Sequence, residues 1–275
     1  MRRLSWCAVA ACIGLTAFLQ AQAPAGSAPQ APAPKSAAPA ADRAVPFRVG
    51  ETLGFDVSWS TFLTAGTASV TVRERRPVGG STAYALVADG QATGFVARLY
   101  HVYYKSESDL DTRSLLPHRA SLYREEGGRR RTDVTRFDRA ARQVHFEAAN
   151  EQRKHSALAM PPDTQDPLSV LFAMRTLDLR PNLRVQFPVA SNGRLYNVQV
   201  TVHGRETIQT PLGAQGAWRL TPAIQQLEPD GGEPRRIVLW LSDDGRRLPL
   251  RVEVDMPVGT FNLVLREVGT SGGGR

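Results

Sequence analysis

Apolar residues occupy every second position over several stretches of the chain. In the first of these, Leu53, Phe55 and Val57 alternate with polar or small residues. Successive side chains of a β-strand point to opposite faces, so a period of two is typical of a strand with one buried face. The stretches with this pattern are residues 53–59, 68–72, 84–88, 198–202, 237–241, 250–254 and 261–265.

Short residue pairs that tolerate a positive φ separate many of the apolar stretches. These pairs are Gly127-Gly128, Asn192-Gly193, Gly231-Gly232 and Asp244-Gly245. Such pairs favour tight hairpins between antiparallel strands. We therefore predict a mainly β chain of about 13–15 strands. A sheet of that length has to curve to limit its edges, as a single antiparallel curved sheet or partly open β-barrel, with a sandwich as the alternative.

One segment breaks the period of two. Asp166 and Pro167 are followed by Leu168, Leu171, Phe172 and Met174, which are spaced three and four residues apart. An aspartate at the N-cap and a proline at the first helical position are typical of a helix start. The spacing predicts one short amphipathic helix over residues 166–177. This helix either caps one end of a barrel or packs on the sheet as a crossover.

The two ends of the chain predict export and disorder. Arg2 and Arg3 precede an apolar run that ends at Leu19, and small residues follow it up to Ala23, which is the layout of a signal peptide over residues 1–23. The Ala/Pro-rich residues 24–45 predict a disordered linker, residues 46–268 the folded domain, and the Gly-rich residues 269–275 a disordered tail. An uncleaved signal that anchors the chain in a membrane, or lipidation at Cys12, is an alternative.

Composition excludes several kinds of site. Both cysteines, Cys7 and Cys12, lie within the predicted signal peptide, so the mature chain would have no disulfide, thiolate metal site or cysteine nucleophile. The formal net charge is +8 and most basic residues are arginine, which fits either a general arginine preference or attraction to anionic envelope material. Nucleic acid is not an expected partner of an exported protein, and we expect no metal or other cofactor.

The strongest catalytic candidates are carboxylates. Glu107, Asp109 and Asp111 would share one face of a strand, where they could bind calcium or act as an acid and base, with Asp243 as a fourth candidate. We favour ion pairs with arginines on neighbouring strands for the first three residues and a hairpin turn for Asp243. The Gly269-x-Ser271-x-Gly273 pattern has no room for the helix that a nucleophile elbow requires.

Several spaced motifs resemble a bacterial exported family, the domain of unknown function DUF3108. They include the opening from Phe47 to Trp59, Asp166-Pro167-Leu168-Ser169 leading to Arg175, and the segment from Trp240 to Asp244. The resemblance implies an envelope location and a curved β architecture, and it carries no activity. The chain is also similar in expected architecture to the unclosed β-barrels of periplasmic lipoprotein carriers, which bind acyl chains under a helical lid.

These observations favour a non-catalytic binding or carrier module in the periplasm. Its ligand would be a lipid or another hydrophobic or amphiphilic molecule, and contact with a membrane would be peripheral. The residues that we expect to line the ligand site are apolar and aromatic: Phe55, Trp59, Phe95, Tyr100, Phe172, Met174, Trp218 and Trp240. Ordinary core packing is the alternative for each of them.

Two other functions are open at this point. The first is a glycan hydrolase that uses Glu107, Asp109, Asp111 or Asp243. The second is a structural assembly factor that binds another envelope protein by adding a strand to an exposed sheet edge.

Overall fold

The computed structural model describes residues 41–59, 63–99, 101–149, 154–226, 236–256 and 259–270. The predicted signal peptide and most of the predicted linker lie outside the described residues, as do residues 271–275 of the predicted tail.

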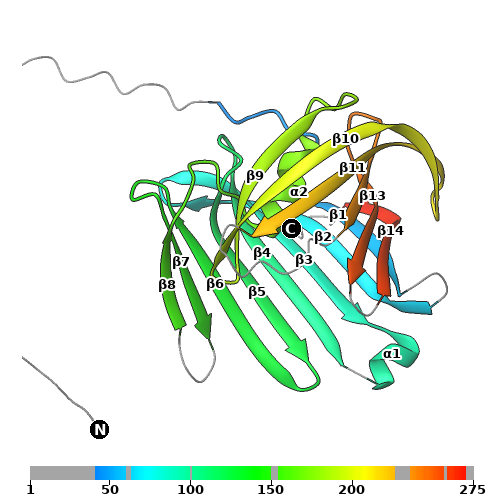
Figure 1. Cartoon of the computed structure of the whole chain (residues 1–275), viewed down its shortest axis with the longest axis horizontal. Coiled ribbons are helices and arrows are strands. Elements are labelled where there is room, and N and C mark those ends of the chain that lie inside the picture. Colours follow the sequence, from blue (N-terminus) through cyan, green and yellow to red (C-terminus); the bar gives the residue numbers. More distant parts are fainter. Residues whose placement is uncertain are drawn as a thin grey trace, which may run out of the picture. The chain divides into compact units, whose positions relative to one another are not determined.

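Strands dominate the described part of the chain, which confirms the prediction of a mainly β protein (Figure 1). The strands are β1 (Glu51–Trp59), β2 (Leu63–Val78), β3 (Ser81–Ala92), β4 (Val102–Asp111), β5 (Pro117–Glu126), β6 (Arg129–Asp138), β7 (Gln143–Ala149), β8 (Lys154–Ala159), β9 (Arg184–Ser191), β10 (Arg194–Thr210), β11 (Gly213–Gln226), β12 (Ile237–Ser242), β13 (Pro249–Met256) and β14 (Gly259–Thr270). The helices are α1 (Gly94–Leu99) and α2 (Pro167–Arg175). The short α1 helix was not predicted.

All fourteen strands form a single antiparallel sheet. Their order is β8-β7-β6-β5-β4-β3-β2-β1-β14-β13-β12-β11-β10-β9. Neighbours in the sheet are neighbours in the chain, except that β1 pairs with β14. The edge strands β8 and β9 are not paired with each other, so the sheet is curved but not closed, as the sequence predicts.

Two of the predicted turn pairs have the expected backbone. Gly127 and Gly128 have φ values of 54° and 83°, and Asn192 and Gly193 have values of 52° and 73°. A positive φ at both central residues lets a two-residue hairpin follow the twist of its strands. Asp244-Gly245 lies in the connection between β12 and β13, whereas Gly231-Gly232 lies outside the described residues.

Helix α2 confirms the one helix that the sequence predicts. Asp166 is the N-cap, and its carboxylate accepts hydrogen bonds from the amides of Leu168 at 2.8 Å and Ser169 at 3.1 Å. The Ser169 hydroxyl accepts from the Asp166 amide at 2.8 Å, which completes a capping box. Pro167 occupies the first turn, where its missing N–H has no intrahelical partner to lose.

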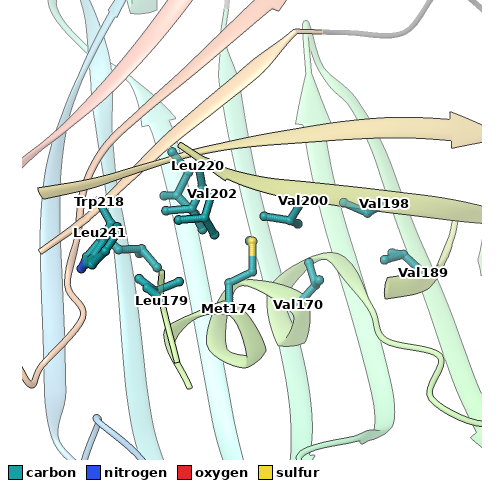
Figure 2. Close-up of a cluster of buried hydrophobic side chains, with 11 residues drawn as sticks. Val170, Met174, Leu179, Val189, Val198, Val200, Val202, Trp218, Leu220 and Leu241 are labelled. Carbon is teal, nitrogen blue, oxygen red and sulfur yellow. The ribbon is translucent and has the colours of Figure 1, made fainter. Parts of the chain in front are cut away.

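Helix α2 lies on the inner face of the sheet and fills the space between its two halves. Figure 2 shows Val170 and Met174 of α2 beneath Val200 and Val202 of β10, in a buried cluster that also includes Trp218. Other residues of the same helix pack on the opposite half: Leu168 and Phe172 share a second cluster with Val72, Leu86 and Leu110. The core is therefore built around the helix.

The segment that follows β8 and leads into α2 pairs with the other edge strand, β9, and forms a seam between the two sheet edges. Gln165 donates to the Pro188 carbonyl and accepts from the Ala190 amide, both at 2.8 Å, as one parallel bridge to β9. On the other side, Met160 donates to the Arg142 carbonyl at 2.9 Å. The β9–β10 turn also reaches across, because a Cβ on Gly193 would lie 3.0 Å from the Phe146 ring of β7.

Candidate ligand-binding surface

The residues expected to line a ligand site do not gather around one space. Five of them are at most 7% exposed and are covered by their neighbours: Phe55, Phe172, Met174, Trp218 and Trp240. They are divided among three buried clusters: Phe172 in one, Met174 with Trp218 in a second, and Phe55 with Trp240 in a third. Tyr100 and the side chain of Phe95 lie outside the described residues.

The two buried tryptophans occupy opposite faces of the sheet. Trp218 is in register with Leu241, whereas Trp240 is in register with Arg219. Neighbouring positions of a strand point to opposite faces, so Trp240 points away from the face that Trp218 and Leu241 share. The Trp240 indole donates a hydrogen bond to Glu206, and the Arg251 guanidinium lies 5.7 Å from its ring centroid.

Trp59 differs from the other candidates because it is 40% exposed. It stacks on Phe261 of the paired strand β14, with ring centroids 6.4 Å apart. Trp59 is in register with Leu63 at the start of β2, and the Ala65 carbonyl of β2 accepts from the Thr93 amide just before α1. Both aromatic residues therefore lie toward the end of the sheet marked by α1, where β3 to β6 continue beyond α2 (Figure 1). We call this the α1 end.

Burial of the inner face decreases from α2 toward the α1 end. Val72, Leu86 and Ser108 form one row across β2, β3 and β4 and are at most 2% exposed. The Ser108 hydroxyl donates to Asp166 at 2.6 Å, which places this row at the start of α2. The next row toward the α1 end, formed by Val70, Ala88 and Ser106, is only half-buried.

The other half of the sheet has the same gradient. In β1 the inner residues pass from the buried Leu53 and Phe55 to the half-buried Val57 and the exposed Trp59. In β14 they pass from the buried Leu265 to the half-buried Leu263. We define the α1-end inner surface by the accessible inner-face residues of both halves: Val57, Trp59, Ala68, Val70, Ala88, Tyr104, Ser106, Leu122, Arg124, Arg131, Tyr196, Ile224, Val252, Phe261 and Leu263.

One part of this surface is polar and the rest is apolar. Strands β4 to β6 contribute Ser106, Arg124 and Arg131. Strands β10 to β14 contribute aliphatic and aromatic side chains, among them Ile224 and Val252. The arrangement suits a molecule with both a polar and an apolar part. Of the residues on this surface, only Trp59 was among the candidates chosen from the sequence, because accessibility depends on where α2 lies along each strand and not on residue type.

The carboxylates of β4 lie on the outer face, where each has cationic or hydrogen-bonding partners. Lys105 lies 2.7 Å from Glu107, and its hydrogen bond holds the pKa of the Glu107 carboxyl below the usual value. Arg76 of β2 donates to Asp109 at 2.9 and 2.5 Å. The favoured interpretation as an ion-paired strand face therefore agrees with the structure, although these bases come from β2 and β4.

Asp111 organises the turn between β4 and β5. Its carboxylate accepts from the amides of Arg113 at 2.9 Å and Ser114 at 2.8 Å, from the Ser81 hydroxyl, and contacts the His118 ring at 3.2 Å. Burial alone would raise the pKa of Asp111, but the bonds from Ser81, Ser114 and Arg113 together hold it well below its usual value. A general acid needs a raised pKa instead, so this environment favours a structural role.

We expect Asp111→Asn to lower the free energy of unfolding by about 1–2 kcal/mol at pH 7, because it removes charge-assisted hydrogen bonds. The folded pKa of Asp111 lies below the unfolded value of about 3.9, so the ionised form stabilises the fold above that pH. This stabilisation is lost as the pH falls through the folded pKa. Urea unfolding should therefore show a difference between wild type and variant that shrinks below about pH 4.

The exposed Asp138 provides a control for this measurement. Its carboxylate caps the Ala141 amide at 2.8 Å in the turn between β6 and β7. Asp138→Asn should cost less than Asp111→Asn at pH 7. Equal losses in the two variants would contradict the role assigned to Asp111.

Asp243 lies in the turn between β12 and β13, as favoured from the sequence. Its amide donates to the Gly216 carbonyl at 3.0 Å. The adjacent Asp244 accepts from the Ser242 hydroxyl at 2.6 Å and from the Arg246 amide at 3.1 Å. The structure gives Asp243 no contact with the β4 carboxylates.

The described residues contain two cavities away from this surface and no cluster of metal ligands. Among them, no three histidine, cysteine, aspartate or glutamate residues gather as metal ligands. A cavity of about 460 Å³ is lined by residues that include His118, Arg139 and Pro161, and one of about 210 Å³ by residues of β6 to β8. Neither described helix combines the length and apolar character that a membrane span requires.

The fold is similar to that of a β-barrel-like protein of the domain of unknown function DUF1849 from Brucella abortus. The TM-score is 0.52 at 10% identity, over 81% of this chain and 98% of that one. A protein from Bacteroides fragilis described as exported, with a YmcC-like fold, matches at a TM-score of 0.32, 10% identity, and 84% and 100% coverage. A protein from Parabacteroides distasonis described as a lipoprotein matches at 0.34, 10% identity, and 83% and 100% coverage.

No curated protein matches the chain. A family model does match, over residues 54–266, which is most of the chain. It agrees with the resemblance noted in the sequence motifs. The chain therefore belongs to the family described as "Protein of unknown function (DUF3108)".

Proposed function

We propose that the protein is a non-catalytic binding or carrier module of the cell envelope that holds a hydrophobic or amphiphilic ligand on its α1-end inner surface. The observation that carries this proposal is the burial gradient of the inner face. On β1 to β3 and on β10 to β14 the inner-face residues are apolar both beside α2, where they are buried, and toward the α1 end, where they are accessible. Accessible apolar side chains that share one concave face favour contact with an apolar ligand.

The position of α2 supports the same proposal. The helix covers the inner face at one level only, so it holds the two halves of the sheet apart and leaves the rows beyond it uncovered by the helix. The predicted signal peptide supports a periplasmic location for this activity. The ion-paired carboxylates of β4 give no support to the alternative of a glycan hydrolase.

The test is direct binding of a fluorescent apolar probe, N-phenyl-1-naphthylamine, to delipidated protein. Gly90 lies on the inner face of β3 in register with Ala68, and a Cβ there would meet the Ala68 Cβ at an ordinary 3.6 Å. Gly90→Leu should therefore fold and fill part of the α1-end inner surface. We expect it to weaken probe binding by about tenfold or more. The new side chain occupies apolar surface that the probe would otherwise cover, and the area lost to the probe is about that of one leucine side chain.

Gln91→Leu is the matched control, because Gln91 is the next residue of β3, is exposed and points to the outer face. It should bind the probe like the wild type. Extraction of freshly purified protein with organic solvent, followed by mass spectrometry, should also release a lipid. The absence of both probe binding and extracted lipid would contradict the proposal.

A further inference from the structure

Two arginines face each other on the polar part of the α1-end inner surface. Arg124 of β5 and Arg131 of β6 are directly in register, and Tyr104 of β4 is in register with Arg124. The Arg124 guanidinium donates to the Asn192 side chain of the β9–β10 turn at 3.4 Å, which confirms that it points inward. Tyr104 is four residues from Ser108, so this row lies about 13 Å along the strand from the start of α2.

These two cations share one buried carboxylate. Arg124 and Arg131 each donate to a different oxygen of Asp133, which is 3% exposed, and the Arg131 Nε–Asp133 distance is 2.7 Å. Like charges directly opposite each other destabilise a sheet, and one carboxylate neutralises only one of the two arginines. The Arg124 Nε–H is buried and has no hydrogen-bond partner among the described residues.

The neighbouring charged residues do not neutralise the excess positive charge of the two arginines. At the next inner position, Glu126 is in register with Arg129 and accepts a hydrogen bond from the Tyr104 hydroxyl. Three arginines therefore face two carboxylates on the inner face of β5 and β6. An unfavourable excess of like charges on an accessible surface is typical of a binding site.

We infer that Arg124 and Arg131 bind the anionic headgroup of an amphiphile, a carboxylate or a phosphate, whose apolar chain lies on the facing apolar part of the surface. The inference rests on the proposed function and adds the charge of the ligand to it. Guanidinium groups bind planar or tetrahedral oxyanions through paired N–H donors, which suits both headgroups. Both side chains stay partly accessible, at 26% for Arg124 and 41% for Arg131.

The experiment compares two probes with the same alkyl chain on delipidated protein. Dodecyl phosphate carries the anionic headgroup and dodecyl maltoside an uncharged one, each used below its micelle concentration. Binding is followed by the fluorescence of Trp59 and the other tryptophans and by calorimetry. We expect the wild type to bind dodecyl phosphate at least about tenfold more tightly, as charge-assisted hydrogen bonds to the headgroup predict.

Substitutions then locate that preference. The double variant Arg124→Gln/Arg131→Gln should lose the preference and bind both probes about equally. The double variant Arg124→Lys/Arg131→Lys should retain part of the preference because it keeps the charge. Arg119→Gln, on the outer face of the same strand β5, is the matched control and should behave like the wild type.

The outcomes separate the two proposals. If dodecyl maltoside binds the wild type as tightly as dodecyl phosphate, the inference about the headgroup is wrong while the proposed function stands. If neither probe binds, the proposed function itself fails. If inorganic phosphate alone competes as strongly as dodecyl phosphate, the arginines bind a free anion and the amphiphile part of the inference is overturned.

Discussion

Replacing Arg175 with methionine is expected to lower the free energy of unfolding by about 3–5 kcal/mol, because it leaves a buried carboxylate without its cation. Arg175 is 1% exposed, and its guanidinium lies 2.7 Å from Glu51 of β1. It also donates to the Arg246 carbonyl at 3.1 Å and lies over the adjacent rings of Phe47 and Phe172, 5.4 and 5.3 Å from their centroids. One side chain thus joins α2 to β1 and to the β12–β13 turn.

Urea unfolding followed by far-ultraviolet circular dichroism measures this loss. The double variant Glu51→Gln/Arg175→Met should recover part of it, because no charge is then left buried without a partner. Arg266→Met is a suitable control, since Arg266 pairs with Asp56 and Glu267 on the exposed face. A loss for Arg175→Met no larger than that for Arg266→Met would show that the buried pair does not hold the helix in place.

Phe172→Ala is expected to destabilise the fold by about 3–5 kcal/mol through the cavity that it leaves. Phe172 is 1% exposed and packs edge-on against Phe47, with ring centroids 4.8 Å apart. It belongs to the cluster that joins α2 to β2, β3 and β4. The loss should be measurable in urea unfolding as a lower midpoint, with an unchanged slope of the unfolding free energy against urea concentration.

Leu171→Ala provides the comparison for this prediction. Leu171 precedes Phe172 in α2 but is only half-buried, against the cluster that faces β10. Its truncation should cost clearly less, since less apolar surface is removed from the core. Equal losses at the two positions would mean that the helix is not held mainly by its contact with β2 to β4.

The fold could be predicted from the sequence because its strands are regular and its turns are local. Leu53, Phe55 and Val57 alternate as a strand should, and Asn192-Gly193 is a turn by composition alone. The start of α2 could also be predicted, because Asp166 and Pro167 act within the first helical turn, although the contribution of Ser169 to the cap was not foreseen. Each of these features depends on residues that are close in the chain.

The candidate site could not be predicted in the same way. Whether Phe55 is covered and Val57 is accessible depends on where α2 lies against the sheet, and no pattern within β1 encodes that position. The pairing of Arg124 with Arg131 depends on the register of a hairpin and on which face is concave. The aromatic residues chosen from the sequence were large enough to be ligand contacts, and for the same reason they were large enough to fill the core.

The seam between β8 and β9 is where we expect the sheet to open most easily. Two backbone hydrogen bonds connect Gln165 to β9, whereas neighbouring strands such as β10 and β11 are joined along a ladder of more than ten residues. Opening the sheet at the seam therefore breaks far fewer backbone hydrogen bonds than separating two neighbouring strands within it. Amide hydrogens of Gln165 and Ala190 should therefore exchange with deuterium earlier than those in the middle of β10, which makes the seam the expected starting point of local unfolding.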